Sequence, residues 1–331
     1  MSVSFYSSMR ISIITGGETG ERDVSIASAK NVASAIGFAA HETFVFPEDQ
    51  ARFLESASKF DLVIPVIHGK GAEDGAVQQL CESLGLPFLF SPIEAHKIGI
   101  DKVLSKEFVA RAGMKTAKRF SRSSAIFPVF VKPRFGGSSV HTACVENAEA
   151  LEMFLENVTE EMMIEEAVSG REFSVGVVEQ NPGDPEALPV IEIVSQNNFF
   201  DYESKYDADH LASEICPARI EGALSRRLQD AAVAVHTLID ASHISRSDFI
   251  VTDVGEVYFL EINTIPGFTN TSLVPKMLKQ ANISFERLLE KWCKNFITLE
   301  IEEDQVWNRL AEKRDTNNAK FVPHEKIFLD S

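Results

Sequence analysis

Residues 246–263 read RSDFIVTDVGEVYFLEIN, in which two short apolar runs flank a tight turn at Val254–Gly255. Runs of this kind predict two β-strands joined by a hairpin turn. A two-residue turn sets residue 253 opposite residue 256, and counting outward predicts two further pairs on one face, because side chains alternate along a strand. These pairs are Asp248 with Glu261, and Arg246 with Asn263.

Two carboxylates that face each other directly across a sheet repel unless a positive charge lies between them. A divalent cation is the simplest such charge. The carboxylates of Asp248 and Glu261 and the amide oxygen of Asn263 are hard ligands, which favour Mg²⁺ or Mn²⁺ and leave coordination positions for phosphate oxygens. The same spacing is also typical of a solvated polar face with cross-strand ion pairs, so the pattern alone leaves both interpretations open.

A second stretch, KPRFGGSS at residues 132–139, places a lysine ahead of a glycine–serine turn. Small residues allow backbone N–H groups to approach an anion closely, and Lys132 adds a positive charge, so the stretch could hold phosphate groups. It lacks the G-x-x-x-x-G-K-[ST] order of a P-loop. An ordinary glycine–serine hairpin turn is the more common use of such residues.

Two further polar positions follow predicted strands near the start of the chain. The stretch GGETGERD at residues 16–23 follows an apolar strand and opens a helix, which is the usual place for a ligand-binding turn, although it lacks the G-x-G-x-x-G spacing of a dinucleotide site. Glu21 could bind an ammonium group there, but a carboxylate at a helix start is more often a cap. His68 ends the next strand, where it could meet a ligand, although a single histidine there is more often structural.

The order of the predicted elements indicates an α/β lobe followed by α+β structure. The first elements are strands at residues 11–15 and 62–67 and helices at residues 24–35 and 75–84. This order implies a parallel sheet with ligands at the carboxyl ends of its strands, in a lobe that we expect to end near His96.

The next elements are helices at residues 101–112 and 148–156 and strands at residues 129–132, 162–166 and 173–178. They predict a small α+β lobe. Residues 195–218 are predicted to form a long irregular loop, of a kind that is usually a functional lid or disordered.

The composition of the whole chain excludes several classes of protein. A chain of 331 residues with 44% hydrophobic content can bury the cores of two or three lobes. Its formal net charge of −17 would repel nucleic acid except where basic residues gather locally. Four cysteines without a C-x-x-C spacing indicate neither a zinc site nor a disulfide framework and suit a reducing cytosol. No apolar run reaches the length of a signal-peptide core or a membrane span, so we expect a cytoplasmic protein without a membrane partner.

Taken in chain order, these segments resemble the D-alanine–D-alanine ligases. Four further motifs carry the resemblance: HGKGAEDG at residues 68–75, Asp101–Lys102, Lys205–Tyr206 and EINTIPG at residues 261–267. The resemblance extends from about Ile11 to Trp292 and implies the three-lobed ATP-grasp fold, with an N-terminal Rossmann-like lobe and the nucleotide held between the other two lobes. The implied limits are 1–96 for the substrate-binding lobe, 97–166 for the central ATP-grasp lobe, and 167–331 for the C-terminal lobe with the metal site, the lid loop and an acidic tail.

The resemblance also implies an activity and a set of partners. The expected reaction is the ATP-dependent ligation of two D-alanine molecules to D-alanyl-D-alanine through a D-alanyl phosphate intermediate, for peptidoglycan precursor synthesis. ATP and two Mg²⁺ (or Mn²⁺) ions are the expected cofactors and D-alanine the small-molecule substrate. The resemblance further implies a cytoplasmic homodimer with no nucleic-acid or membrane partner.

The family's motifs assign roles to individual residues of this sequence. The nucleotide residues implied are Lys102, Lys132, Ser139 and Lys205 at the phosphates, Glu165 and Val168 at the adenine, and Glu172 at the ribose. The metal ligands implied are Asp248, Glu261 and Asn263, in agreement with the face predicted from strand register. For the substrates, the resemblance implies that Glu21 binds the ammonium of the first D-alanine and that Ser272 with Leu273 binds the carboxylate of the second. Arg246 and the N–H of Gly267 would stabilise the oxyanion, and His68 would lie in the same site. Tyr206, bonded to Glu21 and Ser138, would hold the loop closed over the site.

Some residues depart from the family's usual pattern. These are His141, which stands where glycine is usual after the serine pair, the uncommon Phe135–Gly136 and Glu166, and the tail after Glu300, which we predict to be a surface helix. Two alternative functions stay open. One is a ligase of the same fold that makes D-alanyl-D-lactate or D-alanyl-D-serine, although Tyr206 argues against the lactate product. The other is a non-catalytic nucleotide-binding regulator, against which the presence of all four of Lys132, Arg246, Asp248 and Glu261 argues.

Overall fold

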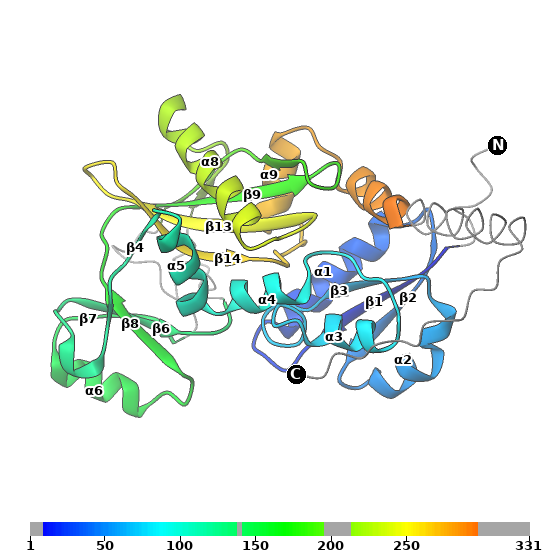
Figure 1. Cartoon of the computed structure of the whole chain (residues 1–331), viewed down its shortest axis with the longest axis horizontal. Coiled ribbons are helices and arrows are strands. Elements are labelled where there is room, and N and C mark those ends of the chain that lie inside the picture. Colours follow the sequence, from blue (N-terminus) through cyan, green and yellow to red (C-terminus); the bar gives the residue numbers. More distant parts are fainter. Residues whose placement is uncertain (1–8, 138–140, 195–212, 297–331) are drawn as a thin grey trace, which may run out of the picture. The chain divides into compact units, whose positions relative to one another are not determined.

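The computed structural model describes residues 9–137, 141–194 and 213–296. The chain divides into two units, Met1–Trp292 and Cys293–Ser331, and the strands and helices named below all lie in the first. The described strands form three sheets; Figure 1 shows the first in blue, the second in teal to green, and the central strands of the third in green and yellow. In the part of the chain that the structure describes, no helix combines the length and the apolar character that crossing a bilayer requires.

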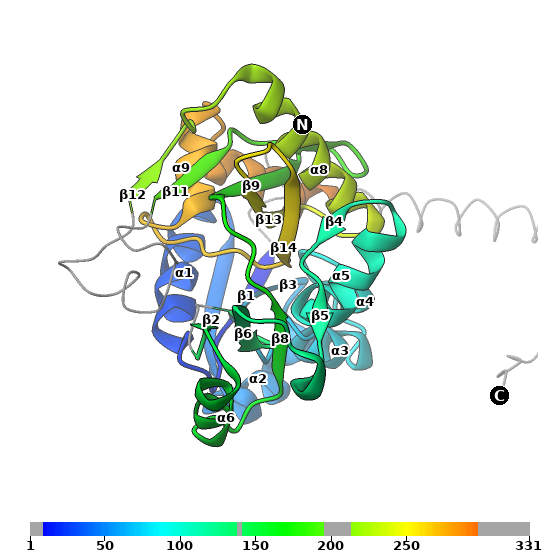
Figure 2. The same ribbon diagram turned by 90° about the vertical axis from the view of Figure 1, so that its left-hand side faces the viewer.

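The first sheet is parallel, as the sequence predicts. Strand β1 (Arg10–Gly16) lies between β2 (Ala40–Phe46) and β3 (Leu62–Val66). The helices that follow these strands are α1 (Arg22–Ala35), α2 (Gln50–Ser56) with the short 3-10 helix η2 (Ala57–Lys59), and α3 (Ala76–Ser83). Figure 2 shows α1 and α3 on opposite sides of the strands. Strand β2 and helix α2 were not predicted, because only the last residues of this edge strand are buried and its start is polar.

The second sheet is antiparallel and has the order β5–β8–β6–β7. Its elements are β5 (Arg119–Phe120), η3 (Arg122–Ser124), β6 (Val129–Pro133), β7 (Ala143–Val145), α6 (Ala148–Glu156) and β8 (Met162–Glu166). Apolar residues Val129, Val131, Leu151 and Ile164 form its core. The bounds predicted for α6 are confirmed, and its start is fixed by the side chain of Asn147, which accepts the N–H of Ala150 at 2.9 Å.

Two helices connect the first sheet to the second, α4 (Ile93–Ile100) and α5 (Lys102–Arg111). Asp101 caps α5, because its Oδ1 accepts the backbone N–H groups of Val103 and Leu104 at 3.0 and 3.1 Å. The cap sets Lys102 at the first position of the helix, and α5 packs against strand β14 of the third sheet.

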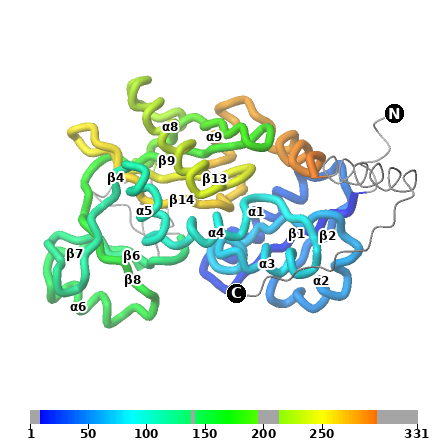
Figure 3. Tube along the Cα trace, in the orientation of Figure 1, coloured from blue at the N-terminus to red at the C-terminus, as the bar shows by residue number. Residues whose placement is uncertain are grey.

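The third sheet contains seven strands in the order β12–β11–β9–β13–β14–β4, with β10 paired to β9. Its strands are β4 (Lys115–Thr116), β9 (Arg171–Glu179), β10 (Pro185–Ala187), β11 (Ile191–Val194), β12 (Ser213–Ile215), β13 (Ile244–Val251) and β14 (Val257–Asn263). Helix α8 (Gly222–Leu238) packs on β9, β10 and β13, and α9 (Leu273–Gln280) packs on β9. Figure 3 shows the yellow hairpin of β13 and β14 running beside the green β9.

The prediction of an irregular loop over residues 195–218 is wrong at Ser213–Ile215. These residues form β12, which pairs antiparallel with β11. A three-residue edge strand has no sequence signal of its own, because its pairing depends on a partner far along the chain. Residues 195–212 lie outside the described part of the structure.

The hairpin has the predicted outer register but a different turn. Asp248 pairs with Glu261, and Arg246 pairs with Asn263, as predicted. The turn contains three residues rather than two, because Thr252 N–H donates to Glu256 O at 3.0 Å and Gly255 has a φ of 79°. A bulge that adds Leu260 to β14 then shifts the register by one residue and restores the outer pairs.

Candidate active site

Asp248 lies on β13 and is held by neighbours on its own and the adjacent strand. The guanidinium of Arg246 donates to its two carboxylate oxygens, from Nε at 3.0 Å and from Nη2 at 2.8 Å. Ser174 on β9 donates its hydroxyl to Oδ1 at 2.5 Å. Burial disfavours the charged guanidinium, but Asp248 and Glu261 more than offset this and hold the pKa of Arg246 above its ordinary value. A permanently positive guanidinium therefore lies on this face of the hairpin.

Glu261 on β14 is the second carboxylate of the face. Its Oε2 lies 3.3 Å from Nζ of Lys102, and the same ammonium donates to the backbone carbonyl of Gly136 in the predicted phosphate stretch. Lys102 thus joins the hairpin face to the phosphate stretch. A small pocket opens at this point, and its lining includes Glu73, Lys102, Gly136, Glu261 and Asn263.

The polar face contains two ion pairs, but neither joins the two strands of the hairpin, because Arg246 and Asp248 both lie on β13 and Lys102 lies on α5. Arg246 and Lys102 make ion pairs with Asp248 and Glu261. Asp248, Glu261 and Asn263 also present hard oxygen donors on neighbouring positions of one face, which is the donor set that Mg²⁺ requires. Among the described residues, no group of three His, Cys, Asp or Glu side chains could hold a metal ion. A cation here would therefore also need the amide oxygen of Asn263 and oxygens of the bound phosphates.

A buried cluster of two lysines and one glutamate lies beside this face. Lys132 Nζ lies 2.7 Å from Glu165 Oε1, and Lys106 Nζ donates to Glu165 Oε2. Burial and the neighbouring Lys132 lower the pKa of Lys106 to about 8. Burial also acts against a charged Lys132, but Glu165 and Glu261 raise its pKa above the usual range. The pKa shifts of the two lysines differ in direction because Lys132 also interacts electrostatically with Glu261.

The phosphate stretch is fixed to the start of α5. Arg134 makes a two-pronged contact with Asp101, at 2.8 Å from Nε and 2.6 Å from Nη2. The backbone N–H of Lys102 donates to Arg134 O at 3.0 Å. These bonds bring the Asp101–Lys102 motif and the Lys132 motif together, as the phosphate-binding interpretation requires.

Glu21, at the start of α1, faces two glycines from different motifs. A Cβ built on Gly69 would lie 3.0 Å from Glu21 Oε2, and a Cβ built on Gly137 would lie 3.2 Å from Oε1. The carboxylate is therefore next to the turn after β3 and to the end of the phosphate stretch, and glycine is what allows both backbones to approach it.

His68 is buried at the end of β3 and bonds to two partners. Its Nδ1 lies 2.9 Å from the carbonyl oxygen of Ile265, which only accepts, so Nδ1 carries the proton. Its Nε2 then accepts the hydroxyl of Ser28 at 3.0 Å. Burial lowers the pKa of His68, although the nearby Glu21 raises it, so the ring is neutral.

Gly267 follows β14 and lies close to Ser272. A Cβ on Gly267 would lie 2.6 Å from Ser272 Oγ, and that hydroxyl is 2.6 Å from Oγ1 of Thr269. The absence of a side chain at Gly267 thus allows the serine to sit against its backbone.

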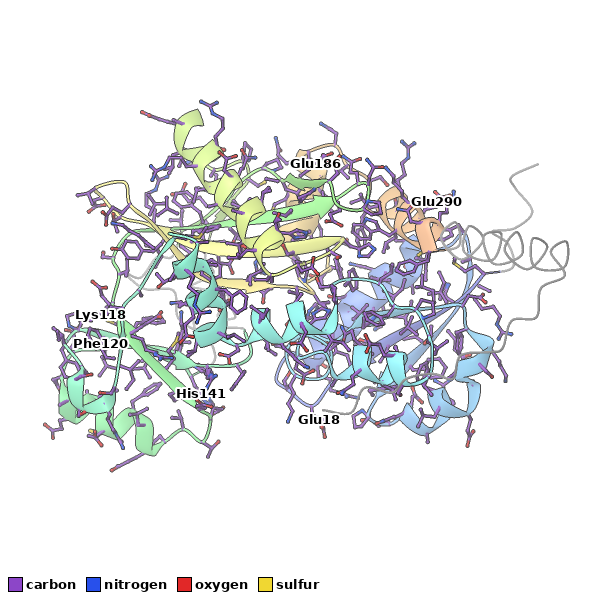
Figure 4. All side chains as sticks on the ribbon, in the orientation of Figure 1. Glu18, Lys118, Phe120, His141, Glu186 and Glu290 are labelled. Carbon is purple, nitrogen blue, oxygen red and sulfur yellow. The ribbon has the colours of Figure 1, made fainter. Side chains whose placement is uncertain are left out.

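The other predicted residues are less fully defined. Val168 lies in the link between β8 and β9, and Glu172 lies on β9 opposite Ile193 and Ile250, so both are at the junction of the second and third sheets. Ser138, Ser139, Lys205 and Tyr206 lie outside the described residues. His141, labelled in Figure 4, has a φ of 53°, in the left-handed region where the family's glycine would be unstrained. Its Nδ1 is 2.8 Å from Glu160 Oε1, and both side chains are exposed.

Sequence reasoning missed two residues of the site, Lys106 and Glu73. Lys106 lies four residues after Lys102 on α5, so helical spacing puts the two lysines on one face, and this signal was available. Glu73 lies within the HGKGAEDG motif, but its contact with Ile265 spans 192 residues and has no local signal.

Comparisons with known proteins give a consistent result. A family model described as the C-terminus of D-ala D-ala ligase matches residues 109–294. A protein of Lawsonia intracellularis named D-alanine–D-alanine ligase is 35% identical over 297 residues, which are 86% of this chain and 96% of that protein. The D-alanine–D-alanine ligase of Bacillus anthracis complexed with ATP is a similar solved structure, with a TM-score of 0.72, 27% identity, and coverage of 89% of this chain and 99% of that one. The VanG D-Ala:D-Ser ligase of Enterococcus faecalis has a TM-score of 0.73, 28% identity, and coverage of 88% and 100%.

Proposed function

Because the chain belongs to the D-alanine–D-alanine ligase family and has its ATP-grasp fold, we propose that the site described above joins two D-alanine molecules and converts ATP to ADP and phosphate. The observation that carries this proposal is the meeting of three motifs at one place. Lys102 pairs with Glu261 and bonds to Gly136 of the phosphate stretch, while Arg246 and Asp248 lie opposite on the same hairpin. This is the arrangement of cations and oxygen ligands that phosphoryl transfer to a carboxylate needs.

In this proposal Lys102 and Lys132 bind the phosphates of ATP, and the link after β8 and Glu172 contact the adenine and ribose. Asp248, Glu261 and Asn263 would hold two Mg²⁺ ions, which is consistent with their hard oxygen donors. When bound, Mg²⁺ neutralises charge on the phosphate oxygens. Arg246 keeps Asp248 oriented through its two hydrogen bonds.

Glu21 binds the ammonium of the first D-alanine, whose carboxylate then attacks the γ-phosphate to give D-alanyl phosphate and ADP. The amine of the second D-alanine, held through its carboxylate by Ser272 and Leu273, attacks the acyl carbon, and phosphate leaves. Negative charge develops on the carbonyl oxygen during this second step. Arg246 and the N–H of Gly267 stabilise that charge, which is the usual task of an oxyanion hole.

One alternative product has a specific observation in its favour. The similar structure from Enterococcus faecalis is a D-Ala:D-Ser ligase, so the fold and this degree of identity are compatible with D-serine as second substrate. Tyr206, the sequence feature that argues against D-lactate, lies outside the described residues.

The test is ADP release by the purified protein with ATP and Mg²⁺, in which D-alanine is compared with L-alanine and with D-alanine plus D-serine or D-lactate. Dipeptide identified by mass with D-alanine alone supports the proposal. Asp248→Asn should abolish most of the activity, whereas Asp253→Asn, in the exposed turn of the same hairpin, should not. ATP binding without turnover on any of these substrates would instead favour the regulator.

We propose further that the lobe limits are 1–96, 97–166 and 167–331 and that the enzyme is a cytoplasmic homodimer. The three described sheets support three lobes, with β4 of the middle segment paired to β14 of the third sheet, and four free cysteines support a reducing compartment. Light scattering on the purified protein measures the mass of the assembly, and a monomer at micromolar concentration would contradict the dimer.

A further inference from the structure

The loop from Asn263 to Phe268 is held at its backbone by side chains of the first lobe. Ile265 donates its N–H to Glu73 Oε1 at 3.2 Å and accepts from His68 Nδ1 at its carbonyl at 2.9 Å. Phe268 donates its N–H to Ser28 Oγ at 3.1 Å and accepts from Asn31 Nδ2 at its carbonyl at 2.9 Å. Both polar backbone groups of both residues are therefore bound.

These bonds lie on either side of Gly267, two residues before it and one residue after it. A peptide whose neighbours are fixed through both N–H and C=O has little freedom to rotate, because the backbone has only two soft dihedrals per residue. The position of the Gly267 N–H is thus set by four side chains that come from α1, the end of β3 and the motif after it.

The supporting side chains are themselves fixed. Glu73 uses its other oxygen, Oε2, to accept the N–H of Gly69 at 2.7 Å, so one buried carboxyl group connects the turn after β3 to Ile265. Ser28 donates its hydroxyl proton to His68 Nε2 and accepts the Phe268 N–H at a lone pair, which links the two halves of the set. His96 adds a bond to Thr264 Oγ1 at 2.7 Å.

We propose that Ser28, Asn31 and Glu73 are positioning residues that hold the Gly267 N–H at the oxyanion in the acyl-transfer step. This inference rests on the proposed function, in which that N–H stabilises the oxyanion. Phosphoryl transfer to the first D-alanine does not need the Gly267 N–H, whereas attack by the second amine does. Positioning residues should therefore affect only the second step, whereas residues with a general structural role would affect both.

The two steps can be measured separately in the full-length enzyme. Positional isotope exchange in ATP labelled with ¹⁸O at the β,γ-bridge reports reversible formation of the acyl phosphate, and dipeptide mass reports the complete reaction. Asn31→Ala is the main variant, because Asn31 is half-buried on a helix where alanine is well tolerated. Ser28→Ala and Glu73→Gln are the second and third variants. Ser12→Ala is the matched control, because Ser12 is a buried serine of the same lobe whose hydroxyl has no hydrogen-bond partner among the described residues.

The expected result is a fall in dipeptide formation of about tenfold to a hundredfold, since a misplaced oxyanion donor loses much of its effect. Isotope exchange should stay within about twofold of the unmodified enzyme, and Ser12→Ala should change neither rate. A parallel fall of exchange and dipeptide formation in Asn31→Ala, or no fall in either, would overturn the inference. Absence of both exchange and dipeptide in the unmodified enzyme would instead contradict the proposed function.

Discussion

Replacing Glu165 by glutamine should destabilise the protein far more than replacing Lys106 by methionine. The two changes alter the charge of the same buried cluster in opposite directions. Glu165 lies between Lys106 and Lys132, so the three side chains together carry one positive charge. Lys106→Met leaves a neutral Lys132–Glu165 pair, whereas Glu165→Gln leaves two ammonium groups facing each other with only Glu261, near Lys132, as counter-charge.

The size of each effect follows from the geometry and the pKa of Lys106. At the 2.7 Å separation of Lys132 and Glu165 and an effective dielectric constant of about 20, the Coulomb attraction is about 6 kcal/mol, most of which offsets desolvation. Removing one partner of such a pair costs about 3–5 kcal/mol. The pKa of Lys106 falls from 10.5 to about 8, so its charged form disfavours folding by about 3 kcal/mol at neutral pH. Lys106→Met should therefore be neutral or stabilise by up to about 3 kcal/mol.

The lowered pKa of Lys106 also predicts how the stability of the protein changes with pH. Between pH 8 and 10.5 the unfolded chain holds the lysine proton while the folded protein has released it, so stability should rise with pH across this window. Lys106→Met should lose that rise. Urea unfolding at pH 7.5 and 9.5 measures both effects, with Glu166→Gln on the exposed end of β8 as the control. Equal destabilisation by Lys106→Met and Glu165→Gln would refute the argument from cluster charge.

Three further changes test other parts of the site. Gly267→Ala would bring a Cβ to 2.6 Å from the hydroxyl of the nearby serine, so KM for the second D-alanine should rise about tenfold or more, while Gly20→Ala, with open space around it, should be silent in the same assay. Ser174→Ala removes a 2.5 Å hydrogen bond to Asp248, and the Mg²⁺ concentration for half-maximal activity should rise about tenfold; an unchanged Mg²⁺ titration would contradict this role. Burial lowers the pKa of His96 to about 3, so between pH 6.5 and 5 only the unfolded chain protonates this histidine. The free energy of unfolding should therefore fall by about 2 kcal/mol between pH 6.5 and 5. The urea midpoint of His96→Gln should fall less over this pH range than that of the unmodified protein. An equal fall in both proteins would refute the assignment of this pH dependence to His96.

The hairpin shows how a correct register can be predicted from an incorrect turn. The alternation of polar and apolar residues sets which side chains share a face, and a slip by one residue would bury Asp248 on the apolar side. The three-residue turn shifts the pairing by one position, and the bulge at Leu260 shifts it back. Neither feature has a clear local signal, but burial of the apolar face requires the two to compensate.

Helices with side-chain caps were predicted well, and short edge strands were not. Asp101 and Asn147 accept backbone N–H groups at the starts of α5 and α6, and both residues are helix-start signals that can be recognised in a sequence. Strand β12 depends on pairing with β11 across a long connection, which composition does not encode. Local chemistry is therefore readable from sequence, and long-range pairing is much less so.

The site itself required more than local patterns. Register placed Asp248 and Glu261 together, but the partners of Glu165 and Glu73 come from elements that no spacing rule connects. The family resemblance identified Lys102 as a phosphate residue, whereas the glycine–serine stretch had already indicated Lys132. It did not supply Lys106, whose partner could be found only in the folded protein.

The distribution of charge gives an independent reason to expect a polyanionic ligand at this site. The chain has a net charge of −17, yet the lysines that are buried among the described residues are Lys102, Lys106 and Lys132, and all three lie here. Burying an ammonium group is unfavourable, so a structural role alone would favour apolar residues at these positions. At Lys106 the acidic partner offsets only part of this cost, since the pKa of Lys106 is lowered even with Glu165 in contact. A phosphate group bound beside these lysines would supply further negative charge. Binding of ATP should therefore offset an unfavourable excess of buried positive charge in the free protein.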